Sequence, residues 1–221
     1  MKYIAKDISN EPRSLKEHRS TPGASYDDCN KRDIRQALLK EQGYICAYCM
    51  QRISEEYDER GYQINSNTAP RIEHYEAQSS PTGEDLRMNF LNMLAVCTGD
   101  RGFADDLLHC DKSRGNVPLT IDPRQESCER YIRYRGNGEI YSDRHDIEQD
   151  LHKTLNLNTP YLKNGRKSAI NLAINNLNKD YSKSSIKKAL KKWEQVNKKG
   201  AFQPFCQAAI YYLSKKLQKP A

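Results

Sequence analysis

The spacing of hydrophobic residues predicts helices in two separate parts of the chain. Residues 29–42 place Ile34, Leu38 and Leu39 on one face of a helix, and Gly43 follows as a stop signal. After residue 146 the helical spacing continues to the C-terminal end, interrupted by Asn, Pro and Gly. It predicts helices over residues 146–156, 164–178, 184–198 and 205–217.

Shorter stretches indicate β structure. Residues 71–75 are typical of a short strand. Residues 131–134 and 139–141 flank the turn sequence Gly-Asn-Gly and predict a β-hairpin. Residues 89–97 form an apolar stretch that is too short to distinguish helix from strand. A further helix is expected from Asp111 onward, so the sequence as a whole predicts the α+β class.

Segments without a hydrophobic period divide the chain. Residues 1–27 are rich in Ser, Pro and charge and predict an irregular lead-in, and residues 54–68 and 98–109 predict polar surface loops. Composition and charge both change near residues 143–146. We therefore expect three parts, namely a lead-in at 1–27, a core domain at 28–143 and a helical region at 144–221.

The charge of the chain is unevenly distributed. The net charge is +7, but residues 151–221 hold fifteen Lys and Arg against Asp180 and Glu194, which gives +13 and leaves −6 for residues 1–150. Such a basic block suits a polyanion or an acidic partner, although a solvated lysine-rich helix face has the same composition. The candidate nucleic-acid contacts in this block are Lys187, Lys188, Lys191 and Lys192.

Composition excludes several other classes. With 37% hydrophobic and 29% charged residues the chain is globular rather than disordered. No apolar run approaches the roughly 20 residues of a membrane helix, and the first residues lack the apolar core of a signal peptide. We expect a cytoplasmic protein that does not bind a membrane.

The cysteines predict a metal site. They are odd in number and no export signal accompanies them, so in a reducing compartment metal binding is favoured over disulfides. Cys46 and Cys49 form C-x-x-C, and Cys97 and Cys110 form a second, wider pair. Four thiolates suit a structural Zn²⁺. The alternatives are a redox dithiol at the first pair, buried thiols at the second, and His109 as a zinc ligand.

Residues of catalytic type lie around these cysteines in a fixed order. Glu73 and His74 lie between the two pairs, Asn92 precedes Cys97, and residues 110–115 read Cys-Asp-Lys-Ser-Arg-Gly. This order resembles the HNH (ββα-metal) endonucleases. It is similar in particular to the PtuB-like subunits of Septu-type and retron-associated anti-phage defence systems, which share the opening MKYIAK, the stretch EQGYICAYC, Ile-Glu-His and Cys-Asp.

The resemblance implies a small ββα-metal HNH core with a zinc knuckle, followed by a β-hairpin and a helical C-terminal region. It implies that His74 is the general base that activates water, a role that suits a neutral imidazole. Glu73 and Asp111 would bind a catalytic Mg²⁺ or Mn²⁺, since these ions prefer oxygen ligands. Asn92 would orient the loop or the imidazole. Phosphate contacts would come from Lys112 and Arg114.

Some positions depart from the family pattern or have simpler explanations. The family usually has Asp before the His where this chain has Glu73, and often Asn or His at Asp111, and Lys at Arg114. Neighbouring strand residues point to opposite faces, so a twisted or bulged backbone would have to bring Glu73 and His74 to one site. Asn92 and Asp111 could each be a helix cap.

Three functions therefore compete. The first is an HNH endonuclease effector that hydrolyses phosphodiesters in an anti-phage defence system, with DNA favoured as substrate over RNA such as tRNA. By resemblance its partners are an ABC/SMC-like ATPase (PtuA-like) and, in retron systems, a reverse transcriptase with its DNA–RNA product. The second is a non-catalytic, zinc-stapled nucleic-acid-binding module, and the third is a scaffold subunit. Residues 1–27 and the tail are the expected docking segments.

Overall fold

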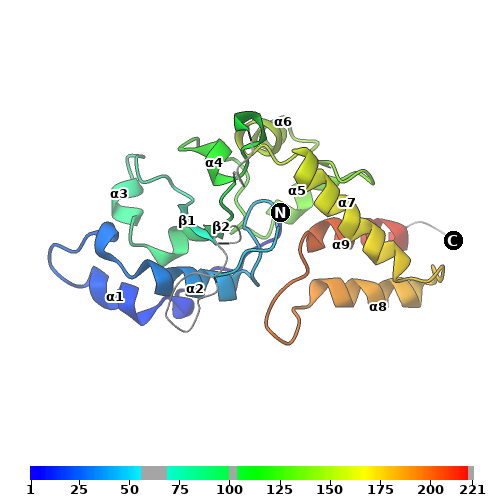
Figure 1. Cartoon of the computed structure of the whole chain (residues 1–221), viewed down its shortest axis with the longest axis horizontal. Coiled ribbons are helices and arrows are strands. Elements are labelled where there is room, and N and C mark those ends of the chain that lie inside the picture. Colours follow the sequence, from blue (N-terminus) through cyan, green and yellow to red (C-terminus); the bar gives the residue numbers. More distant parts are fainter. Residues whose placement is uncertain (56–68, 100–103, 219–221) are drawn as a thin grey trace.

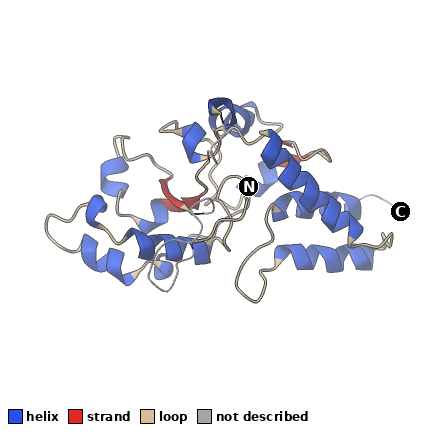
Figure 2. Ribbon diagram, in the orientation of Figure 1, coloured by secondary structure: helices blue, strands red, loops and turns tan. Residues whose placement is uncertain are grey.

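The computed structural model describes residues 1–55, 69–99 and 104–218, and it confirms the predicted α+β class (Figures 1 and 2). Two antiparallel strand pairs, β1–β2 and β3–β4, lie among helices and short 3-10 turns. The elements are α1 (Arg13–Arg19), α2 (Lys31–Glu41), β1 (Arg71–His74), α3 (Gly83–Leu86), β2 (Met93–Val96), α4 (Asp111–Arg114), α5 (Cys128–Tyr131), β3 (Arg133–Tyr134), β4 (Ile140–Tyr141), α6 (His145–Gln149), α7 (Pro160–Asn175), α8 (Lys183–Glu194) and α9 (Cys206–Gln218).

Helix α2 forms where its hydrophobic spacing predicts. Its N-terminus is capped by the Asn30 side chain, which accepts a hydrogen bond from the Asp33 amide at 3.2 Å. The predicted face of Ile34, Leu38 and Leu39 is fully buried, and α2 packs against β1 and β2. The helix therefore backs the sheet from which the candidate site is built.

The lead-in is more ordered than the sequence predicted, so the prediction of an irregular segment at residues 1–27 is wrong. It contains helix α1 and 3-10 turns at Ile8–Asn10 and Tyr26–Asp28. Leu15 is 1% exposed and Ile4 is 6% exposed, and the Ile4 amide donates to the Pro123 carbonyl at 2.8 Å. Isolated apolar residues without a period are weak signals in a sequence, yet each gains free energy once a core is available to cover it.

The undecided stretch at 89–97 divides into two elements. A 3-10 turn at Phe90–Asn92 leads into β2, which pairs with β1 in a register that includes Glu73 opposite Leu94 and His74 opposite Met93. All of β2 is buried, which explains why its sequence lacks the alternation of a half-exposed strand. The predicted strand at 71–75 and the predicted hairpin are both confirmed, the latter as β3–β4.

The C-terminal helices are also confirmed. Thr159 and Ser182 cap α7 and α8, and both α7 and α8 pack against α9. In Figure 1 these three helices form one end of the molecule, while α1 to α4 and β1–β2 form the other. The predicted helix at 146–156 is α6 continued by a π-helical turn at Asp150–Thr154. Among the described residues, no helix is long and apolar enough to cross a bilayer.

The predicted surface loop at 54–68 lies almost entirely outside the described residues, as does part of the loop at 98–109.

Candidate functional site

The C-x-x-C segment forms a tight turn that is tied to the sheet. The Met50 amide donates to the Cys46 carbonyl at 3.0 Å, and the Cys46 amide donates to the Gln51 carbonyl at 3.0 Å. The buried Gln42 side chain at the end of α2 donates to the Ala95 carbonyl at 2.8 Å and accepts from the Ala95 amide at 2.7 Å. These bonds fix the turn against β2 before any metal is considered.

The second cysteine pair is brought together by a closed loop. Cys97 directly follows β2, and Cys110 directly precedes α4. The His109 amide donates to the Gly99 carbonyl at 2.9 Å, so the chain returns to its starting point after the intervening residues. Gly99 has a φ of +76°, and a Cβ there would lie 2.2 Å from the His109 carbonyl oxygen. The wide spacing of this pair is thus compatible with one site.

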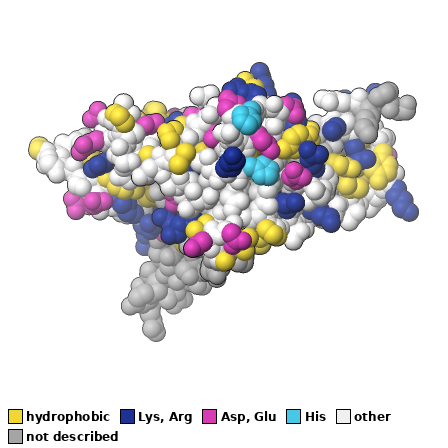
Figure 3. Space-filling model, turned by 90° about the horizontal axis from the view of Figure 1, so that it is seen from above, with side chains coloured by type: hydrophobic (Ala, Val, Ile, Leu, Met, Phe, Trp, Pro, Cys, Tyr) yellow, Lys and Arg dark blue, Asp and Glu magenta, His cyan; other side chains and the backbone are white. Residues whose placement is uncertain are grey.

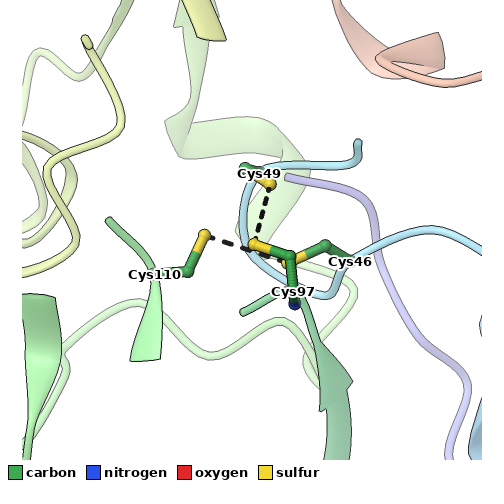
Figure 4. Close-up of side chains that lie close together, drawn as sticks. All are labelled: Cys46, Cys49, Cys97 and Cys110. Atoms are coloured by element: carbon green, nitrogen blue, oxygen red, sulfur yellow. Dashed lines mark hydrogen bonds between the residues drawn. The ribbon is translucent and has the colours of Figure 1, made fainter. Parts of the chain in front are cut away.

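The four sulfurs converge as predicted (Figure 4). The ligand atoms of Cys46, Cys49, Cys97 and Cys110 all lie within 4.8 Å of one another, and all four residues are buried. The Cys46–Cys110 and Cys49–Cys97 sulfur pairs are each 3.8 Å apart. A tetrahedron with Zn–S bonds of about 2.3 Å has edges of roughly 3.8 Å, whereas a disulfide needs about 2.05 Å. The geometry fits a four-thiolate zinc site and excludes disulfide pairing within this set.

Hydrogen bonds favour the thiolate form at Cys46, whereas the neighbouring sulfurs and burial raise the pKa of the Cys97 and Cys110 thiols well above the usual value. The Cys97 amide donates to the Cys46 sulfur at 3.4 Å. Burial opposes ionisation of Cys46, yet hydrogen bonds from the other three cysteines hold the pKa of its thiol well below the usual value. His109 is not one of the four ligands. It is fully buried beside Cys97, and its Nε2 has no hydrogen-bond partner of good geometry.

Glu73 and Asp111 form a carboxylate pair next to the cysteine cluster. Glu73 lies in β1, and Asp111 is the first residue of α4, immediately after Cys110. The Asp111 carboxylate is close enough to Glu73 to influence its ionisation, and it forms an ion pair with Arg71 at 3.1 Å. Burial, and then the nearby Asp111 carboxylate, raise the pKa of Glu73 to about 8, against the opposing effect of Arg114. The cysteine cluster therefore fixes the helix that carries one carboxylate beside the strand that carries the other.

Arg114 does not lie where a phosphate contact was expected. Its side chain is 1% exposed and forms a buried ion pair with Glu73. It also donates to the Tyr48 hydroxyl at 3.0 Å and to the Tyr75 carbonyl at 2.6 Å. In this conformation the guanidinium is a counter-charge for Glu73. Its N–H donors point into the protein, so they do not contact a phosphate at the surface. Lys112, on the same helix, is exposed.

The His74 imidazole lies apart from the carboxylate pair. Its Nε2 donates to the Arg87 carbonyl at 2.8 Å, so in the neutral ring Nδ1 accepts from the Gln78 amide at 3.1 Å. Burial lowers the pKa of His74, which favours this neutral form. The expected backbone bulge is absent from the described β1, because His74 and Glu73 keep a regular pairing register and so point to opposite faces of the strand.

Asn92 holds the chain that follows β1. Its Oδ1 accepts from the Glu76 amide at 2.8 Å and its Nδ2 donates to the Glu76 carbonyl at 3.0 Å. This reciprocal pair pins the segment just after His74, a contact of the kind that orienting this loop would require. A simple helix-cap role does not account for it, because the cap of the adjacent 3-10 turn is the side chain of Asn89.

Two residues at the site were missed by the sequence analysis. Tyr48, inside the C-x-x-C turn, is fully buried and donates to Glu73 Oε1 at 2.9 Å. The Gln78 side-chain amide donates a hydrogen bond to His74 Nδ1. A large polar aromatic residue between two ligand cysteines is a signal that could have pointed to Tyr48, whereas nothing in the sequence marks Gln78.

The lysines predicted to contact nucleic acid are exposed along α8. Lys188, Lys191 and Lys192 line a cavity of about 410 Å³ together with Arg52 from the segment after the C-x-x-C turn. In Figure 3, which shows the molecule from above, Lys and Arg side chains are scattered over the whole visible face. The basic block of the sequence is therefore a basic surface in the fold.

These features define a class. The chain is a mixed α+β protein in which four buried cysteines, arranged as a zinc site, hold a strand pair and a short helix that present two carboxylates. No family model matches the chain. An Escherichia coli protein named "Retron Ec83 putative HNH endonuclease" is similar to it, with 28% identity over 90 residues. The match covers 38% of this chain and 31% of the relative, so the chain spans under a third of that protein's length.

Proposed function

We propose that this protein is a metal-dependent endonuclease of the HNH type that hydrolyses phosphodiester bonds in nucleic acid. The observation that carries the proposal is the Glu73–Asp111 pair beside the four-cysteine cluster. Carboxylate oxygens are the ligands that Mg²⁺ and Mn²⁺ prefer in proteins. The similarity to a relative named as a retron HNH endonuclease supports the same class of activity.

Each residue then has a distinct task. Glu73 and Asp111 would hold one divalent ion, which when bound neutralises charge on the scissile phosphate and aids departure of the leaving oxygen. His74, neutral because of its lowered pKa, would take the proton from the attacking water. For this Gln78 must release Nδ1, or the Arg87 carbonyl must release Nε2–H so that the ring can change tautomer. The end of β1 must also twist, because His74 and Glu73 point to opposite faces of the strand. Asn92 would keep the segment after His74 in place.

A second candidate is a zinc-stapled module that binds nucleic acid without cleaving it. It is favoured by two observations, the neutralisation of Glu73 by Arg114 and the engagement of both His74 nitrogens. The cavity along α8 that is lined by Lys188, Lys191 and Lys192 would serve either function, because lysines bind the phosphate backbone without regard to base sequence.

The decisive experiment incubates the purified, zinc-loaded chain with duplex DNA, single-stranded DNA and total RNA, in Mg²⁺, in Mn²⁺ and without divalent ion. Cleavage should require the ion and should fall at least about 100-fold in His74→Ala and in Asp111→Asn, the scale of a lost general base or metal ligand. His145→Ala is the matched control, since His145 is an exposed histidine on α6 far along the chain. Cleavage by His74→Ala at the parent rate would contradict the role given to His74. Binding by the parent chain without ion-dependent cleavage would contradict the nuclease proposal and favour the binding module.

We further propose that the chain acts in anti-phage defence with a partner ATPase of the ABC/SMC type, with DNA as the first substrate to test and structured RNA such as tRNA as the second. The support is the name of the relative together with the sequence resemblance. Co-purification of an ATPase encoded beside this chain, with cleavage that depends on it, tests the assignment. A stable complex that leaves cleavage unchanged would contradict it.

A further inference from the structure

A second cavity lies away from the carboxylate pair, between the hairpin β3–β4 and helix α9. Its volume is about 350 Å³, within the range of ligand sites. Three half-buried tyrosines line it, Tyr141 from β4 and Tyr211 and Tyr212 from α9. Helix α9 packs directly on β3, so the wall of the cavity is part of the fold rather than a free loop.

The tyrosine rings are held in defined orientations. Tyr211 meets the buried ring of Tyr134 edge-on, with centroids 5.7 Å apart and an interplanar angle of 61°. Tyr141 lies on the same cavity wall as Tyr211, and its ring is covered on one side by Arg135. Rings fixed in this way are pre-organised surfaces for stacking, because little side-chain entropy remains to be lost when a flat ligand binds.

The remaining lining is cationic. Arg135 lies over the Tyr141 ring at 4.6 Å, and Lys216 lies over the Tyr212 ring at 5.4 Å, with Lys215 beside them. No Asp or Glu lines the cavity among the described residues. Glu139, which does not line the cavity, pairs with Arg135 at 3.5 Å; the Arg135 side chain is 58% exposed and that of Glu139 is 28% exposed.

We infer that this cavity binds an unpaired nucleotide of a single-stranded nucleic acid, with the base against the tyrosine rings and the phosphates on Arg135, Lys215 and Lys216. Aromatic faces with an interleaved basic rim are the chemistry by which proteins hold single strands, since every base offers a face for stacking. A fully paired duplex hides those faces, so it could use the cations alone. The inference rests on the proposed function only in taking nucleic acid as the ligand.

The test is fluorescence anisotropy with zinc-loaded protein and no added Mg²⁺ or Mn²⁺, so that binding is measured without cleavage. The probes are a labelled 15-nucleotide dT strand, a labelled 15-nucleotide U strand and a 15-base-pair DNA duplex. The variants Tyr141→Leu and Tyr212→Leu keep apolar bulk but remove the ring. Each should weaken single-strand binding by about 10-fold, as expected for loss of one stacked base, and change duplex binding by less than twofold.

Matched variants separate stacking from structure. Tyr141→Phe and Tyr212→Phe keep the ring and should bind single strands nearly as the parent does. Tyr131→Leu, at an exposed tyrosine that does not line the cavity, should have no effect. If a Leu variant unfolds, Tyr141→Met or Tyr212→Met, which also lacks the ring but has a more adaptable side chain, provides the test and should show the same selective loss of single-strand binding.

The results of the anisotropy experiment separate a site that stacks bases from one that only attracts phosphates. A selective loss with dT, with U or with both supports the inference and states which strand is preferred. Parent-like single-strand binding by the Leu variants, equal losses for single strand and duplex, or losses in the Phe variants as large as in Leu would overturn it. Because no divalent ion is added, binding is measured whether or not the chain can cleave. Failure of the proposed nuclease in the separate cleavage experiment would therefore not count against this site.

Discussion

Arg114 and Glu73 form a buried ion pair whose partners come from α4 and β1, with the Tyr48 hydroxyl bonded to both. The pair ties the helix that directly follows Cys110 to the strand that carries Glu73 and His74. The cysteine cluster joins the end of β2 to the start of α4, and this ion pair joins α4 to β1, the strand paired with β2.

Removing the cation should leave Glu73 buried without a counter-charge. We expect Arg114→Ala to lower the free energy of unfolding by about 3 kcal/mol, as for a buried pair that loses one partner. The loss should be smaller at pH 6 than at pH 9, because Glu73 can take up a proton when the pH is low. Urea denaturation at both pH values measures this. Arg13→Ala is the control, since Arg13 is in an exposed pair with Glu17 and should change stability by less than about 0.5 kcal/mol. An equal effect of the two substitutions on the free energy of unfolding would show that the buried pair does not stabilise the fold more than an exposed pair does.

Zinc should be needed for the fold of the first half of the chain. We expect about one zinc per chain and a melting temperature lower by roughly 10 °C or more in Cys46→Ser or after chelation, because metal binding supplies folding free energy. Zinc content and calorimetry measure the two effects. Cys29→Ser is the matched control, because Cys29 is a buried cysteine outside the cluster. Unchanged zinc content in Cys46→Ser would contradict the assignment.

The raised pKa of Glu73 predicts a pH-dependent stability. Between its ordinary pKa of 4.5 and the folded value of about 8, the folded state holds a proton that the unfolded state has released. The contribution of this group to stability is therefore present at low pH and is lost as the pH rises through that window. Glu73→Gln should flatten the dependence, measured by urea denaturation from pH 5 to 9 without Mg²⁺. The same slope in the Gln variant would show that another group is responsible.

Gln78 should set the acid side of the cleavage profile. Its amide donates to His74 Nδ1 and so stabilises the neutral ring, in the same direction as burial. We expect Gln78→Ala to raise the pKa of His74 and move the acid limb of the pH–rate profile toward higher pH. Cleavage rates between pH 5 and 8 measure the shift. A profile that moves in the opposite direction would show that Nδ1 carries the proton.

The lysines of α8 should govern the salt dependence of duplex binding. Changing Lys188, Lys191 and Lys192 to Gln should reduce the slope of log K against log salt by up to about 0.9 for each phosphate that is no longer neutralised. Anisotropy titrations from 50 to 200 mM salt measure the slope. Lys167→Gln is the control, because Lys167 lies on α7 and does not line the cavity along α8. An unchanged slope would identify these lysines as a solvated helix face.

The sequence by itself determined the parts of this protein in which a local pattern carries the information. Residues 29–42 and the C-terminal helices followed from hydrophobic spacing, because a 3.6-residue period has few alternative structures. The hairpin followed from its Gly-Asn-Gly turn, and the convergence of the cysteines followed from the limited chemistry of thiols.

Only the tertiary structure decided what depends on long-range contact. The lead-in joins the core through residues such as Leu15 that have no local period, and the same Arg114 that the family pattern directs to phosphate is turned onto Glu73. Both ring nitrogens of His74 are hydrogen-bonded, Nδ1 to the Gln78 side chain and Nε2 to the Arg87 carbonyl. In each case the role of the side chain follows from the hydrogen-bond or charge partner that it meets in the interior, because buried polar groups are paired in folded proteins. Those partners are remote in the sequence and become neighbours only after folding.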